Sequence, residues 1–301
     1  MDVTGNPTIS RRRLGAELRR LRETSGMTTQ QVAARLLISQ PKISLLENGR
    51  RLIKPRDVRD LCELYGVRDR RRIERLMEMA AESGRQGWWK VYGDIPYGAY
   101  IDLEAEAAAI RCFEPLVVPG LLQTPSYARE VIAGTIPHGT AEHAAACLQV
   151  RLRRQARLYA PGDKRLRLWV VLDEAVLWRV VGGPEVMREQ LDHVVHLGAQ
   201  PYVTVQVLPH DAGAHPGVSG QFSLLEFADT SDASVVYLER FTSDLYVENR
   251  SDVRRYSDLY AHLQARALSP DSTRRLIAEV AGAYAVAESR SDARPPTPSN
   301  A

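Results

Sequence analysis

Three side chains along one stretch of the sequence, Gln40, Lys42 and Leu45, have the chemistry needed to distinguish one base pair from another. A glutamine amide can form two hydrogen bonds with adenine, a lysine ammonium can donate to guanine or phosphate, and a leucine can contact the thymine methyl group. All three lie in a predicted helix from Gln40 to Asn48, on the side opposite to its apolar residues. The sequence therefore offers a candidate surface for reading DNA.

The distribution of charge along the chain is consistent with the same chemistry. Residues 1–87 contain 19 Lys and Arg against 11 Asp and Glu, a net charge of +8. Residues 88–301 contain 21 against 26, a net charge of −5, so that the whole chain has a net charge of only +3. A small basic part joined to a larger acidic part indicates that the basic part binds a polyanion.

The basic part is expected to be entirely helical, because its apolar residues recur with helical periodicity between capping residues, glycines and prolines. We predict five helices, at about 12–25, from residue 28 or 29 to about 36, at 40–48, from 55 to about 65, and from 70 to about 82. Gly26 and Gly49 are expected to end the first and third helices, and Asp69 is expected to cap the fifth.

An apolar seam is expected to hold the second and third helices together. It consists of Val32, Ala33, Leu36, Ile38, Ile43 and Leu46. The small side chain of Ala33 allows the two helices to cross at close range. The seam leaves the opposite face of the third helix exposed, and this face carries Gln40, Pro41, Lys42, Ser44 and Leu45.

The segment Met27–Arg51 resembles the helix-turn-helix of the phage repressor and Cro family, also called the Cro/C1 or xenobiotic-response-element type. In that family the third helix enters the major groove of double-stranded DNA, and flanking residues hold phosphates without specifying a sequence. The resemblance implies a DNA-binding protein that acts in transcription regulation. Its implied DNA-binding residues are Thr29, Gln30, Gln40, Pro41, Lys42, Ser44, Leu45, Asn48, Arg50 and Arg51.

Three further implications follow from this resemblance. Arg22 and Glu47 stand where the family commonly has a structural ion pair between the first and third helices. Thr29 stands where the family usually has glutamine, so that one contact with DNA is shorter or absent. Leu37 stands where the family often has glycine. Either the turn needs no left-handed residue there, or Leu37 adopts that conformation under strain.

Beyond a polar, glycine-containing stretch at residues 83–87, helical and strand patterns are mixed. Helical periodicity is found at 102–111, 125–133, 141–158, 184–199, 252–267 and 270–288. Runs of Val, Leu, Phe and Tyr predict strands at 166–172, 203–208, 221–227 and 234–239. We therefore expect a multidomain chain, in which an all-α five-helix DNA-binding domain is followed by an α+β or α/β domain.

These patterns divide the chain into five expected regions. They are a flexible N-terminus at 1–10, a helix-turn-helix domain at 11–83, a linker at 84–100, an α+β effector- or partner-binding domain at 101–288, and a disordered tail at 289–301. The tail is rich in proline, which favours disorder over a packed structure.

The segment Glu114–Arg129 is similar to the signature of a domain of unknown function found in actinobacterial regulators. The similarity continues through Val203–Pro209, Gly220–Phe222, Val235–Glu239 and Leu268–Pro270. In WhiJ-like developmental regulators and antitoxin-like proteins, this domain follows the same kind of helix-turn-helix. The resemblance implies a binding domain whose partner is either a small acidic protein or a small-molecule effector.

Several polar side chains of the second part could in principle form a catalytic or metal site. They are Asp173 and Glu174 after a predicted strand, His193 and His196 on a predicted helix, and His210, Asp211 and His215 in a loop. A helix N-cap, surface histidines and a polar loop explain these residues better than a site does. No glycine-rich phosphate loop and no nucleophile elbow occurs. We expect no enzyme activity, no cofactor and no metal; the alternative is an enzyme, for example a hydrolase, that uses its helix-turn-helix for targeting or autoregulation.

The sequence also bears on location and assembly. It contains no apolar run of about 18 residues, and its N-terminus is polar and then basic. We expect a cytoplasmic protein without a membrane partner. Double-stranded DNA is the expected partner, and a homodimer is the candidate assembly.

Overall fold

The computed structural model describes residues 9–49, 51–84, 88–93, 95, 97–136, 139–228, 233–240 and 244–292. The chain forms two compact units, one of residues 1–91 and 96–106 and the other of residues 92–95 and 107–301. Residues 1–8 and 293–301, which are most of the two predicted flexible ends, lie outside the described residues, as does Arg50. Residues 9–10 and 289–292 belong to the first and last helices.

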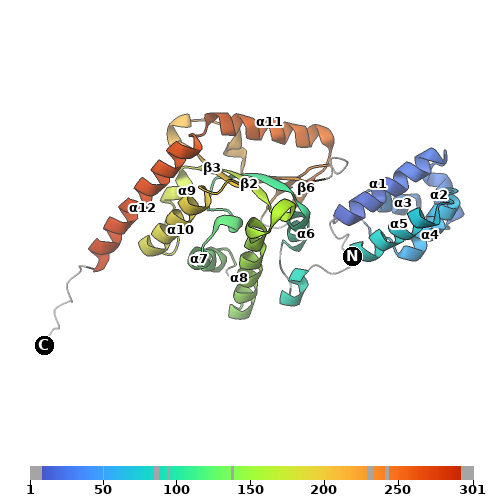
Figure 1. Ribbon diagram of the computed structural model, residues 1–301, viewed down its shortest axis with the longest axis horizontal. Helices are drawn as coiled ribbons and strands as arrows, with labels where there is room; N and C mark the ends of the chain where they lie inside the picture. The colour runs from blue at the N-terminus through green and yellow to red at the C-terminus, as the bar shows by residue number, and fades with distance from the viewer. Residues whose placement is uncertain are drawn as a thin grey trace. The chain divides into compact units, whose positions relative to one another are not determined.

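The first unit contains the five helices that the sequence predicts (Figure 1). They are α1 (Ile9–Thr24), α2 (Thr29–Arg35), α3 (Gln40–Glu47), α4 (Pro55–Leu64) and α5 (Arg70–Ser83). A short 3-10 helix, η1 (Trp88–Tyr92), and the helix α6 (Gly98–Glu106) follow in the sequence. The all-α character of this region is thus confirmed.

Local side-chain chemistry explains where these helices begin and end. Thr28 caps α2, and its side chain and that of Gln31 each accept a hydrogen bond from the other's backbone N–H. Asp69 caps α5 by accepting from two backbone N–H groups of its first turn. Gly26 and Gly49 follow α1 and α3 with φ of 71° and 65°, a backbone conformation that favours glycine.

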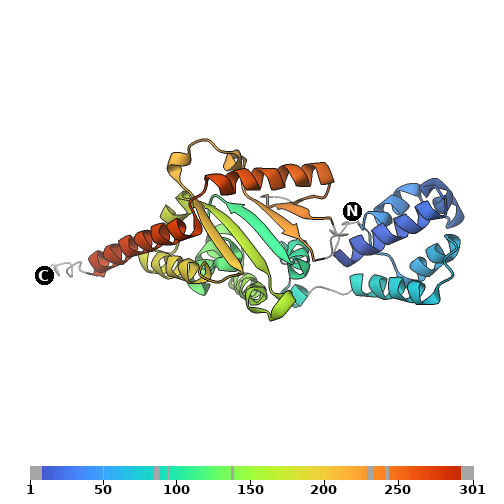
Figure 2. The ribbon, with the colours of Figure 1, turned by 45° about the horizontal axis from the view of Figure 1, so that its top comes forward.

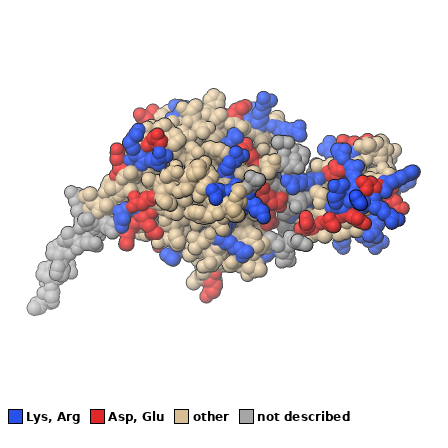
Figure 3. Space-filling model, viewed as in Figure 1, with Lys and Arg blue, Asp and Glu red and all other residues tan. Residues whose placement is uncertain are grey.

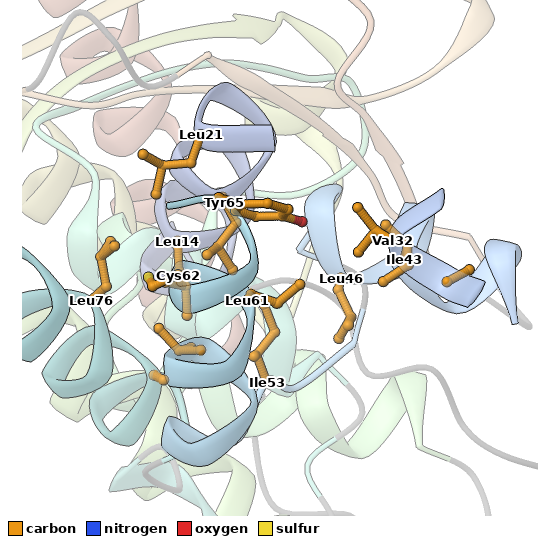
Figure 4. Close-up of a cluster of buried hydrophobic side chains, with 14 residues drawn as sticks. Leu14, Leu21, Val32, Ile43, Leu46, Ile53, Leu61, Cys62, Tyr65 and Leu76 are labelled. Atoms are coloured by element: carbon orange, nitrogen blue, oxygen red, sulfur yellow. The ribbon is translucent and has the colours of Figure 1, made fainter. Parts of the chain in front are cut away.

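One apolar core joins all five helices (Figure 4). Its buried members are Leu14, Leu18, Leu21, Val32, Ala33, Ile43, Leu46, Ile53, Val58, Leu61, Cys62, Tyr65, Leu76 and Ala80. Leu36 and Ile38 are partly buried against this core. The predicted seam between α2 and α3 is therefore confirmed, and it continues into the contacts that α1, α4 and α5 make.

The helices α1 and α3 approach each other closely at Gly15. A β-carbon placed on Gly15 would lie 2.7 Å from the carbonyl oxygen of Leu46 and 2.6 Å from that of Glu47. Both distances are shorter than real β-carbon contacts, so a larger residue would force the two backbones apart.

The turn between α2 and α3 resolves the alternative left open for Leu37. Its φ is 55°, and among the described residues no other non-glycine residue has a positive φ. The side chain is 92% exposed, so no burial offsets the strain of this conformation. The turn does need a left-handed residue, and a leucine provides it.

The second unit is built on a six-stranded mixed sheet with the strand order β3-β2-β1-β4-β5-β6. The strands are β1 (Ala109–Glu114), β2 (Arg167–Asp173), β3 (Val203–Leu208), β4 (Phe222–Glu226), β5 (Val235–Leu238) and β6 (Leu245–Val247). β1, β2 and β3 pair in parallel, whereas β4, β5 and β6 pair antiparallel. Together with its helices this sheet confirms the expected α+β domain.

Two strands were not expected from the sequence. The prediction of a helix over 102–111 is wrong for its last part, because α6 ends at Glu106 and residues 109–114 form the central strand β1. The alanines of this stretch favour a helix locally, but β1 is paired on both edges, with β2 and with β4. The strand β6 has only three residues, too few for a recognisable pattern.

Helices cover both faces of this sheet (Figure 2). On one face lie α7 (Pro125–Thr135), α8 (Ala141–Gln155) and α10 (Pro184–Leu197), and α12 (Pro270–Asp292) packs along α10. On the other face lies α11 (Arg250–Arg266), and the short α9 (Ala175–Trp178) follows β2. None of the helices in the described part of the chain is both long enough and apolar enough to span a membrane.

We expect the substitution Gly15→Ala to lower the free energy of unfolding by about 1–3 kcal/mol, the usual cost of overpacking an interior. Gly134→Ala is the matched control, because Gly134 lies within α7 and nothing lies within 4 Å of the position that a β-carbon would take there. That control should raise the free energy of unfolding by about 0.5–1 kcal/mol. Urea unfolding followed by circular dichroism measures both. A gain for Gly15→Ala equal to that of the control would show that α1 and α3 can separate without cost.

Replacing Leu37 by glycine should stabilise the first unit. The left-handed conformation costs a residue with a β-carbon about 1–2 kcal/mol, and the entropy that glycine loses on folding removes part of this gain. We expect a net increase of up to about 1 kcal/mol in the free energy of unfolding. Leu37→Ala retains the β-carbon and should give no such increase. Equal stabilities of the two variants in urea unfolding would exclude strain at this position.

Candidate nucleic-acid interface

The helix α3 separates its buried residues from the ones that the sequence assigns to DNA. Ile43, Leu46 and Glu47 are buried. Gln40 and Pro41 are exposed at its first turn. Lys42, Ser44 and Leu45 are half-buried, so their side chains reach solvent with part of their surface. The candidate face of α3 is therefore accessible, most fully at its N-terminal end.

Gln40 is held by a residue of the preceding helix. Its side-chain nitrogen donates a hydrogen bond to the hydroxyl of Thr29, at 3.2 Å between Nε2 and Oγ1. The hydroxyl of Thr29 accepts this bond and can still donate its own proton to another acceptor. The sequence treats the two residues as separate contacts, whereas the structure brings them together across the turn. The hydrogen bond limits the orientations of the Gln40 amide.

A bidentate ion pair between Arg22 and Glu47 ties α1 to the C-terminal end of α3. Arg22 donates from Nε to Oε1 of Glu47 at 2.6 Å and from Nη2 to Oε2 at 3.0 Å. The two side chains are only 11% and 7% exposed. The hydrogen bonds from Arg22 to Glu47 raise the pKa of the Arg22 guanidinium, and this keeps it charged.

The same arginine also holds the loop that leads into α2. Its Nη1 donates to the carbonyl oxygen of Met27 at 2.8 Å. A single guanidinium thus fixes the end of α3 and the entry into α2 with three hydrogen bonds. Both helices of the candidate interface therefore take their position from α1.

A second charged contact secures α5 to α1. Glu17 accepts hydrogen bonds from Arg20 at 2.9 Å and from Arg72 at 2.5 Å. These hydrogen bonds, that from Arg20 first, lower the pKa of the Glu17 carboxyl to about 2. Glu17 therefore stays ionised at neutral pH and offsets part of the repulsion among the basic side chains of this unit.

The remaining predicted contacts flank α3. Gln30, Asn48 and Arg51 are exposed and Thr29 is half-buried, whereas Arg50 lies outside the described residues. Lysine and arginine side chains cover much of the visible surface of the helical unit (Figure 3). The structure thus leaves the described members of the predicted set available to a polyanion.

Four of the polar residues that the sequence raised as catalytic candidates lie near the C-terminal ends of β2 and β3, namely Asp173, Glu174, His210 and His215. Nε2 of His215 lies 3.6 Å from Oδ2 of Asp173, and Nδ1 of His210 lies 3.6 Å from Oε2 of Glu174. Asp173 also accepts from the backbone N–H of Ala175, as expected of a residue at a helix start. Glu174 accepts from the backbone N–H of His210. The carboxylates of Asp173 and Glu174 thus connect the end of β2 to the loop that contains His210 and His215.

Asp173, Glu174, His210 and His215 are not arranged as a metal site. Among the described residues, no group of three or more His, Cys, Asp and Glu side chains is arranged to hold a metal ion. His193 lies apart on α10, where burial and the neighbouring His196 lower its pKa. Asp211 lies in the 3-10 helix of residues 210–212.

Comparison with known families agrees with this division of the chain. A family model described as a helix-turn-helix domain matches residues 13–76, which include α2–α4 and parts of α1 and α5. A second model, described as a domain of unknown function (DUF5753), matches residues 97–279, more than half of the chain. No curated protein and no solved structure matches the chain. The chain therefore belongs to the family defined by this domain of unknown function (DUF5753), and carries a helix-turn-helix domain in front of it.

Proposed function

We propose that the protein is a sequence-specific DNA-binding transcriptional regulator that places α3 in the major groove of double-stranded DNA. The observation that carries this proposal is the exposed N-terminal end of α3, where Thr29 orients the amide of Gln40. An oriented glutamine amide can pair with both the acceptor and the donor that adenine presents in the major groove. Lys42 and Leu45, further along α3, suit guanine or phosphate and the methyl group of thymine.

Phosphate contacts are proposed for the residues around α3. Thr29 can donate its hydroxyl proton while it accepts from Gln40, and the exposed Gln30, Asn48 and Arg51 have donors for phosphate oxygens. Arg50 is assigned to the same role from the sequence. These contacts position the protein on the duplex, and the basic charge of residues 1–87 supplies most of the affinity that does not depend on sequence.

The helix-turn-helix is proposed to be of the phage repressor and Cro type. The Arg22–Glu47 ion pair supports this assignment, because the resemblance in sequence implied a pair at these two positions. The order of domains, with the domain of unknown function second, supports a regulator of the WhiJ-like and antitoxin-like kind. A homodimer is proposed as the DNA-bound form, since such domains commonly bind two half-sites.

The second domain is proposed to bind a partner protein or a small effector rather than to catalyse a reaction. In the cluster of Asp173, Glu174, His210 and His215, each carboxylate accepts a hydrogen bond from a backbone N–H and lies 3.6 Å from a histidine nitrogen. Those contacts support a structural role for the cluster, and the proposed function uses the second domain only for binding.

Two substitutions test the proposed reading and positioning roles. Gln40→Ala should cost about 1–3 kcal/mol on the cognate duplex and little on a scrambled one, because it removes a contact with a base edge. Arg51→Ala should weaken binding to both duplexes and make the salt dependence shallower by about one unit, because it removes a phosphate contact. The cognate duplex is selected from a random library with the unmodified protein, and affinities are measured by fluorescence anisotropy at several salt concentrations.

Arg254→Ala is the matched control for the loss of one positive charge, because Arg254 is an exposed residue of α11 in the second unit. It should leave both affinities and the salt dependence unchanged. If Gln40→Ala weakened binding to both duplexes equally, α3 would not read sequence through this residue. Binding of the unmodified protein that does not respond to salt would contradict the proposal as a whole.

A further inference from the structure

The second unit contains a cavity of about 470 Å³ between the N-terminal half of α11 and the ends of β4, β5 and β6. Its floor is formed by the apolar side chains of Phe222, Leu238 and Val247 from the three strands. Tyr256 and Leu259 of α11 also line it. The volume lies within the range of about 300–1,000 Å³ that is typical of sites for small organic molecules.

Two aromatic side chains of the lining, Phe222 and Tyr256, contact each other. The ring centroids of Phe222 and Tyr256 are 5.3 Å apart, and their planes are inclined by 57°. Phe222 is fixed, since only 3% of its surface is exposed and its ring also contacts Phe113 and Tyr260. The aromatic surface that a planar apolar group can reach is therefore mainly that of the half-buried Tyr256, which is held against the fixed ring of Phe222.

Charged residues stand at the same cavity. Its lining includes Arg240, Arg255 and Asp252. Nη1 of Arg255 lies 3.9 Å from Oδ1 of Asp252, so Asp252 offsets part of one positive charge. Two arginines against one aspartate leave an excess of one positive charge over an apolar floor, and a planar guanidinium can hold a carboxylate or sulfonate with two hydrogen bonds.

We propose that this cavity is a binding site for a small organic anion with a flat apolar body, such as an aromatic carboxylate or sulfonate. The apolar body packs on Phe222 and Tyr256, and the anionic group faces Arg240 and Arg255. In the proposed function this ligand is the effector of the second domain. Only that role rests on the proposed function, because the binding itself does not involve DNA.

The test uses two fluorescent probes with the same ring system on the full-length chain. 1-Anilinonaphthalene-8-sulfonate carries one negative charge, whereas N-phenyl-1-naphthylamine lacks the sulfonate and is uncharged. We expect saturable binding of the anionic probe at one site per chain, with the blue-shifted emission of an apolar environment. The uncharged probe should bind more weakly. Because no DNA is present, failure of this test is distinct from failure to bind DNA.

Three variants locate the anionic group of the probe. The double substitution Arg240→Gln and Arg255→Gln should lower the affinity for the anionic probe about tenfold or more, since it removes two charge-assisted hydrogen bonds. Asp252→Asn should raise that affinity by about two- to fivefold, because it removes a competing negative charge. Arg254→Gln, a neighbouring exposed arginine of α11 that does not line the cavity, should change it by less than about twofold.

Affinity for the uncharged probe should stay the same in all these variants, which separates a loss of charge from a loss of fold. The proposal is overturned if the unmodified chain shows no saturable binding of the anionic probe. It is also overturned if the double arginine substitution leaves that affinity unchanged or lowers the affinity for both probes equally. An increase for Asp252→Asn that is confined to the anionic probe supports the site.

Discussion

The close contact between α1 and α3 is the constraint on which the candidate interface depends. A helix of eight residues is not stable alone in water, so α3 keeps its shape only through what it packs against. Gly15 lets the backbones meet, and the Arg22–Glu47 pair fixes the end of α3 with hydrogen bonds that solvent cannot easily replace. Removing one partner of such a pair is costly, because the other charge would stay buried. Contacts with α1 on the buried side of α3 therefore hold its exposed face in position.

Much of the first unit could be predicted because its determinants are local. Thr28 and Asp69 mark helix starts through their own hydrogen bonds, and Gly26 and Gly49 mark helix ends through their backbone conformation. The seam between α2 and α3 follows from residues close together in the sequence. Leu37 shows the limit of this reasoning. Its residue type argues against a left-handed conformation, and only the surrounding helices show that the turn imposes one.

The second unit was predicted less completely, because its determinants lie far apart in the sequence. The alanines just before β1 and at its start favour a helix locally. The segment forms a strand because β2 and β4 pair with its two edges. The residues that form the cavity also come from separate elements of the chain. Its floor joins Phe222, Leu238 and Val247 from three strands, and α11 supplies further lining residues. No short sequence pattern predicts such a site. The local sequence shows only that Asp252, Arg255, Tyr256 and Leu259 have the spacing of residues that share one face of a helix, here α11.

The cavity lies beside the N-terminal half of α11, whereas the C-terminal half of this helix packs against the sheet in the apolar core. Towards its C-terminus, α11 places Tyr260 and Leu263 on the sheet, and both are buried with Phe113 and Phe222. Towards its N-terminus, Val253 and Tyr256 still pack against this core, but Asp252 and Arg255 line the cavity with side chains that are 48% and 84% exposed. Phe222 belongs to both regions. The floor of the cavity is therefore part of the core itself, and a ligand bound there would cover the apolar surface that Tyr256 and Leu259 of α11 still expose.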